Sequence, residues 1–286
     1  MFALKKSRKV AIALIMLVAL LLAACSSGEE KVSSGGSITI GAEQEPDCLD
    51  FVGSCSGSSW GYWMVAVNTL PRVFSAERVG DDDVWEYQTT DLMAEEPRLE
   101  TDPVQKITYT ISDDAVWSDG KPIVGEDFVY TWDQIANTDD VYDQTGYKNI
   151  DKVEVDKDDS KVVVVTFKDG EEFAPWKSLF SGNYGVLPSH ILKGKDRNAE
   201  TADGYAFSGG PFKLEGGSKG WKKGESITLV RNDNYWGEKA KLDKVTFRFQ
   251  TDTNAQFTAF KAGETVAIYP QPQVDVIESM RVGDLP

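Results

Sequence analysis

The clearest change of hydrophobic period along the chain lies between Val116 and Ile135. An extended run gives way to Ser118-Asp119-Gly120, where the Asp-Gly pair tolerates a positive φ. From Val124 onward the apolar residues recur at helical spacing, at positions 124, 128, 129, 132 and 135. Glu126 and Asp127 add negative charge to the first turn, where the helix dipole favours it. The segment therefore predicts a strand, a turn and a helix.

Short strands and helical stretches alternate along the rest of the chain. Residues 60–74 carry an aromatic and aliphatic stripe at helical spacing up to Pro71, which is typical of a core helix. Residues 253–269 predict a helix followed by a strand, and the polar run 156–160 predicts the turn of a hairpin. Further strands are expected at 37–41, 85–93, 106–111, 161–167 and 242–250. These elements together predict a mixed α/β (α+β) fold.

The N-terminus reads as a targeting segment, with Lys5, Lys6, Arg8 and Lys9 before an uncharged apolar run from residue 10 to residue 24. That run is short for a membrane span. It ends in Leu-Ala-Ala-Cys, which resembles a bacterial lipobox with Cys25 as the lipidated residue. We therefore predict a lipoprotein signal peptide at 1–24 and a flexible tether at 25–37. The alternative is an ordinary secretory peptide with an incidental cysteine.

Charge and size exclude some classes of function. The chain has 286 residues and a net charge of −16, and removal of the four basic residues at its start leaves 26 basic against 46 acidic side chains. Such an excess of acid argues against nucleic-acid binding and against adhesion to anionic lipid, since both need a basic patch. The length and the 41% of hydrophobic residues allow a sizeable core.

Two cysteines remain once Cys25 is assigned to lipid. Cys48 and Cys55 would close a short loop in an exported protein, which favours a disulfide. A structural zinc site needs four Cys or His ligands, and the chain offers only these two and His190. We expect no metal site and no cofactor.

The turn-and-helix segment resembles the signature of the family 5 extracellular solute-binding proteins, the oligopeptide- and dipeptide-binding components of ABC importers. Ser118-Asp119-Gly120, Pro122 and Glu126-Asp127 match that signature in order. Other stretches resemble family motifs in the family's order, namely Leu187–Leu192, Ser208–Leu214, Arg231–Gly237 and Ala262–Glu264. The resemblance implies a periplasmic-binding-protein-like fold of type II, with lobe I largely present at 38–268. Residues 269–286 would be the hinge crossing and the start of a lobe II that is mostly missing.

Departures from the family pattern carry their own expectations. Val124 stands where the family has a Thr, so the helix would start without a side-chain cap, a loss of ~1 kcal/mol. In the motif at 187–192, Ser189 would cap the next helix and His190 would be structural. The ligand-binding residues implied by the resemblance come from the loop after the first strand, the helical stripe, the 208 turn and the last strand. They are Glu43, Glu45, Pro46, Trp60, Tyr62, Ser208, Gly209, Tyr269, Pro270 and Gln271.

The function implied is not enzymatic and has no catalytic residues. The resemblance implies a lipid-anchored protein at the outer face of the bacterial cytoplasmic membrane, which captures short peptides and delivers them to ABC permease subunits. Within the family a nickel chelate or an oligosaccharide is also a known kind of ligand. A chain that stops after one wall of the cleft should bind peptide more weakly than about millimolar.

Two other hypotheses stay open at this point. One is a truncated surface lipoprotein that binds nothing. The other is a secreted carboxylate-based hydrolase, because acidic residues are abundant. His190 is the only imidazole in the chain, and no Gly-x-Ser-x-Gly motif accompanies it, which argues against a serine or cysteine triad.

Overall fold

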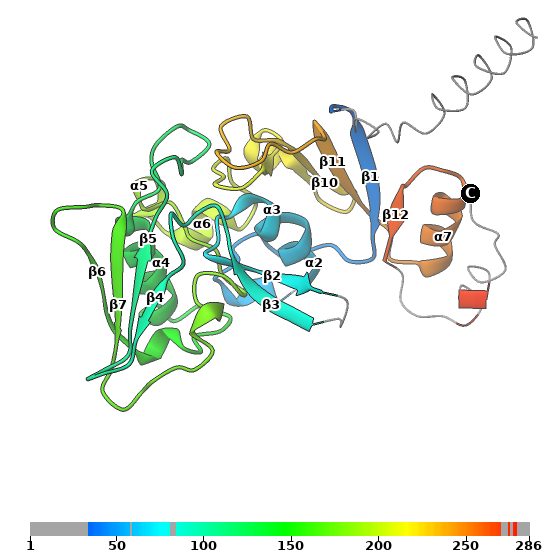
Figure 1. Cartoon of the computed structure of the whole chain (residues 1–286). Coiled ribbons are helices and arrows are strands. Elements are labelled where there is room, and N and C mark those ends of the chain that lie inside the picture. The colour runs from blue at the N-terminus through cyan, green and yellow to red at the C-terminus, as the bar shows by residue number, and fades with distance from the viewer. Residues whose placement is uncertain (1–33, 58, 81–83, 270–273, 275–276, 279–286) are drawn as a thin grey trace, which may run out of the picture. The chain divides into compact units, whose positions relative to one another are not determined.

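The first strand, β1 (Ser37–Ala42), lies inside the main sheet, between β11 (Lys244–Phe249) and the edge strand β12 (Ala267–Ile268), as Figure 1 shows. It runs parallel to both neighbours. Beyond β11 the sheet continues antiparallel through β10 (Ser226–Arg231) to β8 (Phe212–Leu214), and β9 (Trp221–Lys222) also pairs with β10. The β-branched residues of β1 predicted a strand. They did not predict which strand pairs with it, because Lys244, the sheet partner of Ser37, stands 207 positions later in the chain.

The structure, a computed structural model, describes residues 34–57, 59–80 and 84–269, together with residues 274, 277 and 278. The described residues from Gly35 onward form a single compact unit. The predicted signal peptide, Cys25 and most of the predicted tether lie outside the described residues, as do Pro270 and Gln271. In the part of the chain that is described, no helix is both long and apolar enough to cross a bilayer.

A second sheet has the strand order β4-β5-β7-β6 and is antiparallel throughout. Its strands are β4 (Arg98–Glu100), β5 (Lys106–Thr110), β7 (Val162–Phe167) and β6 (Ile150–Val155). The predicted hairpin around residues 156–160 is confirmed as the pair β6 and β7. The predicted helix is confirmed as α4 (Gly125–Ala136), which packs against this pair and buries Phe128 and Ile135.

The start of α4 has no side-chain cap at Val124, as predicted, yet the Val124 N–H is not left unpaired. Oδ2 of Asp127 accepts the Val124 N–H at 3.1 Å and the Nε1–H of Trp117 at 3.0 Å. Its other oxygen accepts the backbone N–H and the hydroxyl of Ser189, at 2.7 and 2.6 Å. Ser189 therefore does not cap α5 (Ser189–Leu192), contrary to prediction, because its hydroxyl is committed to Asp127.

Several shorter elements complete the fold. The helical stretch predicted after residue 60 is a continuous run that ends at Thr69, and the strand expected from residue 85 is confirmed as β3, although shorter. The bounds are α2 (Ser59–Gly61), a π-helical segment (Tyr62–Ala66), α3 (Val67–Thr69), β2 (Phe74–Val79), β3 (Val84–Thr89), α6 (Arg197–Thr201) and α7 (Thr253–Lys261). The hairpin β2 and β3 forms a sheet of two strands.

A lysine side chain fastens the loop before α4 to the second sheet. The Nζ of Lys161 donates to the carbonyl oxygens of Ser112 and Ile123, each at 2.9 Å. Burial lowers the pKa of this ammonium group. The signature turn is thus held in place by Lys161 on one side and by Asp127 on the other.

Candidate functional site

A cleft of about 620 Å³ lies at the carboxyl ends of β1 and β12. Carboxyl ends of parallel strands are where open α/β sheets bind ligands. The cleft is lined by side chains from β1, the helical run and β12, namely Ile40, Glu43, Trp60, Trp63, Ala267, Ile268 and Tyr269. Three of the predicted ligand-binding residues, Glu43, Trp60 and Tyr269, therefore meet at one place, although 226 positions separate the first from the last.

Local contacts explain how these residues come together. Glu43 directly follows β1, and its Oε1 accepts the indole N–H of Trp60 at 3.0 Å. The Trp60 ring meets the Tyr269 ring edge to face, with 6.0 Å between centroids and 72° between planes. A Cβ on Gly41 would stand 2.9 Å from a methyl carbon of Ile268. The glycine therefore permits β12 to lie close against β1 and bring Tyr269 to the cleft.

Two aromatic side chains of the cleft wall are largely exposed. Trp63 exposes 63% of its surface and Tyr269 exposes 72%. Large apolar side chains at adjoining positions on an exposed wall are typical of an interaction site, since single exposed apolar residues need no explanation but clusters do. The wall is therefore built to pack against something that is apolar or that interacts with aromatic faces.

A smaller cavity of about 240 Å³ shares Trp63 with the cleft. Tyr62 lines this second cavity and does not line the cleft. Its hydroxyl donates to the Gly182 carbonyl oxygen at 2.6 Å and accepts from Nη1 of Arg72 at 2.6 Å. The Arg72 guanidinium also lies over the Tyr62 ring, and burial lowers its pKa. Tyr62 is thus held by Arg72 and the Gly182 carbonyl, and it lines the second cavity instead of the cleft.

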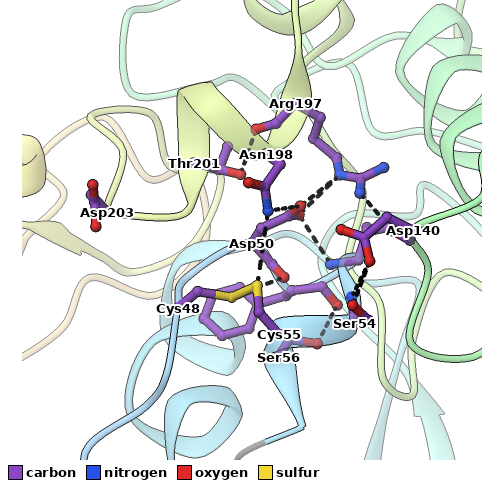
Figure 2. Close-up of a disulfide and its surroundings, with 12 residues drawn as sticks. Cys48, Asp50, Ser54, Cys55, Ser56, Asp140, Arg197, Asn198, Thr201 and Asp203 are labelled. Carbon is purple, nitrogen blue, oxygen red and sulfur yellow. Dashed lines mark hydrogen bonds and ion pairs between the residues drawn. A yellow bond between two sulfur atoms is a disulfide. The ribbon is translucent and has the colours of Figure 1, made fainter.

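The loop that borders the second cavity is closed by a disulfide between the predicted pair Cys48 and Cys55, whose Cα atoms are 5.8 Å apart. Asp50, inside this loop, accepts from Nε of Arg197 at 2.9 and 3.0 Å, and both side chains are almost fully buried. Figure 2 shows that the Arg197 guanidinium also reaches toward Asp140, whose carbonyl oxygen accepts from Nη2. The loop is therefore tied both covalently and by a buried ion pair.

Glu45 and Pro46, predicted as ligand-binding residues, make internal contacts outside the cleft. The Glu45 carboxylate accepts the Trp221 indole N–H and the Gly224 backbone N–H, both at 2.8 Å. Pro46 is buried, and a Cβ on Gly61 would stand 2.8 Å from its Cβ. Both residues fix the course of the loop after β1, so the structure gives them a supporting position.

Ser208 and Gly209, also predicted as ligand-binding residues, lie outside this cleft. Ser208 is fully buried, and its backbone exchanges hydrogen bonds with Ser118 at 2.7 and 3.0 Å. A Cβ on Gly209 would stand 2.8 Å from Pro71 and 3.2 Å from the Trp117 ring. This second family motif therefore packs against the first one and fastens its turn.

His190 has a structural partner. Its Nε2 lies 2.9 Å from Oδ2 of Asp119 in the signature turn. Burial would raise the pKa of Asp119, but hydrogen bonds from the Lys121 backbone and from His190 outweigh it, and the pKa is lowered. Among the described residues, no group of three or more His, Cys, Asp or Glu side chains could hold a metal ion.

Four residues that line the cleft are not among the predicted ligand-binding residues. Ile40, Ala267 and Ile268 are strand residues with the pattern of core positions, and Trp63 belongs to a stripe that predicted a core helix. The available signal was the density of tryptophan in Trp60-Gly-Tyr-Trp63, because two indoles three positions apart on a helical run lie on the same face.

Comparison with known proteins gives a consistent result. The family profile described as bacterial extracellular solute-binding proteins, family 5 (middle), matches residues 89–281. The chain is 27% identical over 285 residues to the oligopeptide-binding protein OppA of Bacillus subtilis, covering 91% of this chain and 49% of OppA. It is 32% identical over 163 residues to the probable monoacyl phosphatidylinositol tetramannoside-binding protein LpqW of Mycobacterium tuberculosis, covering 56% of this chain and 24% of LpqW.

Among solved structures, the periplasmic EDTA-binding protein EppA is similar to this chain with a TM-score of 0.75 and 31% identity. The similarity covers 88% of this chain and 46% of EppA. The chain therefore spans half or less of the length of these relatives. Their names describe three different kinds of ligand.

Proposed function

Because the chain belongs to the bacterial extracellular solute-binding proteins of family 5, we propose that it is the substrate-binding component of an ABC importer and that it captures short peptides. The predicted fold class, periplasmic-binding-protein-like of type II, is confirmed by the solved structures. We propose that residues 38–268 act as lobe I and that residues 269–286 begin the crossing to a second lobe. The observation that carries the proposal is the aromatic wall at the carboxyl ends of β1 and β12.

The chemistry of the wall suits capture rather than catalysis. Extended peptides are held by backbone hydrogen bonds, while side chains pack into apolar or aromatic surfaces. Trp60, Trp63 and Tyr269 offer such a surface, and the relative OppA is named as an oligopeptide-binding protein. A hydrolase would need an activated nucleophile or a pair of carboxylates in the cleft, and Glu43 is the single carboxylate among its described lining residues.

Binding can be tested with the tryptophans of the wall as reporters. Because one wall of the cleft should bind peptide only weakly, we expect short peptides at concentrations above about millimolar to change the intrinsic fluorescence of the full chain, and to do so less in Trp63→Ala. The matched control is Trp85→Ala, because Trp85 on β3 is exposed to a similar degree, 69% against 63%, and lies outside the cleft. Tyr269→Ala should weaken binding roughly fivefold, the effect of losing one aromatic contact. Equal effects of Trp63→Ala and Trp85→Ala would contradict the site.

We further propose that Cys25 carries lipid and holds the protein at the outer face of the cytoplasmic membrane, next to its permease subunits. Support comes from the Leu-Ala-Ala-Cys motif and the polar tether that follows it. Wild type should partition into detergent and Cys25→Ala into the aqueous phase. Release of both proteins into the medium to the same extent would refute the anchor.

A further inference from the structure

The second cavity, which shares Trp63 with the cleft, has an uncharged lining. It is mainly aromatic, with the rings of Phe51, Tyr62, Trp63 and Tyr142, and its polar side chains are Ser56 and Asn183. None of its described lining residues is acidic or basic. Because Trp63 lines both spaces, a ligand that lies against the cleft wall can place one of its groups in this cavity.

A guanidinium lies behind one wall of the cavity. Cζ of Arg72 is 4.7 Å from the centroid of the Tyr62 ring. Nη1 donates to the Tyr62 hydroxyl and to the carbonyl oxygens of Ser181 and Gly182, which are all uncharged acceptors. Nε and Nη2 are buried and have no acceptor among the described residues.

Arg72 differs in this respect from Arg197, whose Nε lies 2.9 Å from the Asp50 carboxylate. Within the described part of the chain, no carboxylate forms an ion pair with Arg72. Buried charges in proteins are normally paired, because an isolated ion loses its hydration. Burial lowers the pKa of Arg72, but a guanidinium keeps its proton in folded proteins. Its positive charge therefore acts through the Tyr62 wall with less screening than in water.

The acidic residues near Tyr142 in sequence do not enter the cavity. Asp140 accepts hydrogen bonds from the backbone N–H and the hydroxyl of Ser54, as Figure 2 shows. Oδ1 of Asp143 accepts the Thr145 backbone N–H at 2.9 Å. Neither Asp140 nor Asp143 lines the cavity, so the described lining places no negative charge against an anionic group.

The rim of the cavity carries neutral hydrogen-bond donors. Tyr142 exposes 53% of its surface, and Asn183 is also exposed. Neither side chain is hydrogen-bonded to another residue of the described chain. A side-chain amide and a phenolic hydroxyl can both donate to a carboxylate, and such bonds are stronger than those between neutral groups.

We propose that the second cavity receives a carboxylate of the ligand. The Asn183 amide and the Tyr142 hydroxyl donate to it, and Arg72 supplies positive charge from behind Tyr62. The inference rests on the proposed capture of peptides, and it narrows the substrate class to peptides that place an acidic side chain or their C-terminal carboxylate beside Trp63.

A first experiment tests the cavity without peptides. The side-chain ¹H–¹⁵N resonances of the full chain are recorded with sodium acetate and with the same concentration of acetamide, with sodium chloride added to match the ionic strength. Assignment uses Trp63→Phe and Asn183→Asp. We expect acetate to shift the Trp63 indole and Asn183 amide signals and to leave Trp85 unchanged. Equal shifts in the two solutions, or no shift with acetate, would overturn the inference.

A second experiment compares the tripeptides Ala-Glu-Ala, Ala-Gln-Ala and C-terminally amidated Ala-Gln-Ala, at concentrations above about millimolar. The first pair differs by the side-chain carboxylate and the second pair by the C-terminal one, so the two pairs show which carboxylate enters the cavity. We expect removal of that carboxylate to weaken binding about tenfold, the effect of one hydrogen bond to a charged group.

Variants show whether the cavity causes this preference. Asn183→Asp places a negative charge on the exposed rim and should abolish the preference, whereas Asn254→Asp, at an exposed position of α7 outside the cavity, should keep it. Arg72→Lys keeps the positive charge and should keep most of the preference, and Arg72→Met should lose it. Urea unfolding checks that each variant is folded. A preference that persists unchanged in Asn183→Asp would overturn the site.

The two proposals fail separately. A shift with acetate but no binding of any tripeptide would contradict peptide capture and support the carboxylate site. Binding of all three tripeptides with equal affinity would support peptide capture and overturn the carboxylate site. No shift with acetate and no binding of peptide would contradict both.

Discussion

Replacing Asp127 by asparagine should destabilise the fold far more than its conservative size suggests. The buried carboxylate accepts four hydrogen bonds, two on each oxygen, from Trp117, Val124 and Ser189. An asparagine keeps one accepting oxygen and turns an NH₂ group toward the other two donors. Two buried donors would then lose their acceptor, and each such loss costs about 1–2 kcal/mol.

We therefore expect Asp127→Asn to lower the free energy of unfolding by about 2–4 kcal/mol. Asp127→Ala, which removes all four acceptor contacts, should cost ~4 kcal/mol or more. For a chain of this size the asparagine variant should unfold roughly 5–15 °C below wild type. The measurement is urea unfolding followed by circular dichroism, together with a thermal scan of each variant.

Glu126→Gln is the matched control. It removes the same charge from the same first turn of α4, but Glu126 is exposed and its ion pair with Lys193, at 3.5 Å, is solvated. Such a pair is worth less than about 1 kcal/mol. If Asp127→Asn lost no more stability than Glu126→Gln, the helix dipole would account for the effect, and the reasoning from buried donors would be refuted.

Three further substitutions test other contacts. Arg197→Met should lower the free energy of unfolding in urea by about 3–5 kcal/mol, because it leaves the Asp50 carboxylate buried without its guanidinium partner. Adding Asp50→Asn should restore part of the loss, and strictly additive effects of the two substitutions would contradict an interaction between these side chains. Lys161→Met should be less stable than wild type by an amount that grows as the pH rises toward 10.5. Burial lowers the pKa of Lys161, so the folded wild-type chain releases this proton at a lower pH than the unfolded chain does, and wild type gains stability over that range. A stability difference that does not change with pH would refute this. Replacing Cys48 and Cys55 by serine should cost ~2 kcal/mol, and a reductant should lower the unfolding midpoint of wild type but not of the variant.

Sequence patterns predicted elements well where periodicity decides the structure. The helix α4, the hairpin of β6 and β7, and the helix and strand at the end of the described chain all follow from spacing and turn residues. The short loop between the two cysteines favoured a disulfide for the same reason, because the partners are close along the chain.

Side-chain partners far apart along the chain were not predictable in this way. Glu45 is bound by Trp221, 176 positions later, and Ser208 packs against a turn 90 positions earlier. Nothing in the local sequence around Glu45 or Ser208 specifies those contacts, so both looked available for a ligand. The family order of motifs showed that these segments belong together, but it did not show that two motifs would bind each other.

The position of β1 between two strands from the far end of the sequence has a consequence for how the chain is made. Synthesis proceeds at about 5–20 residues per second, so roughly 10–40 s separate the appearance of Ser37 from that of Lys244, its partner in the sheet. Throughout that interval Ser37–Ala42 is an apolar, β-branched segment with both edges unpaired. The strand on which the cleft is built is thus the earliest of the described strands to be synthesised, and both strands that pair with it come from the last part of the described sequence.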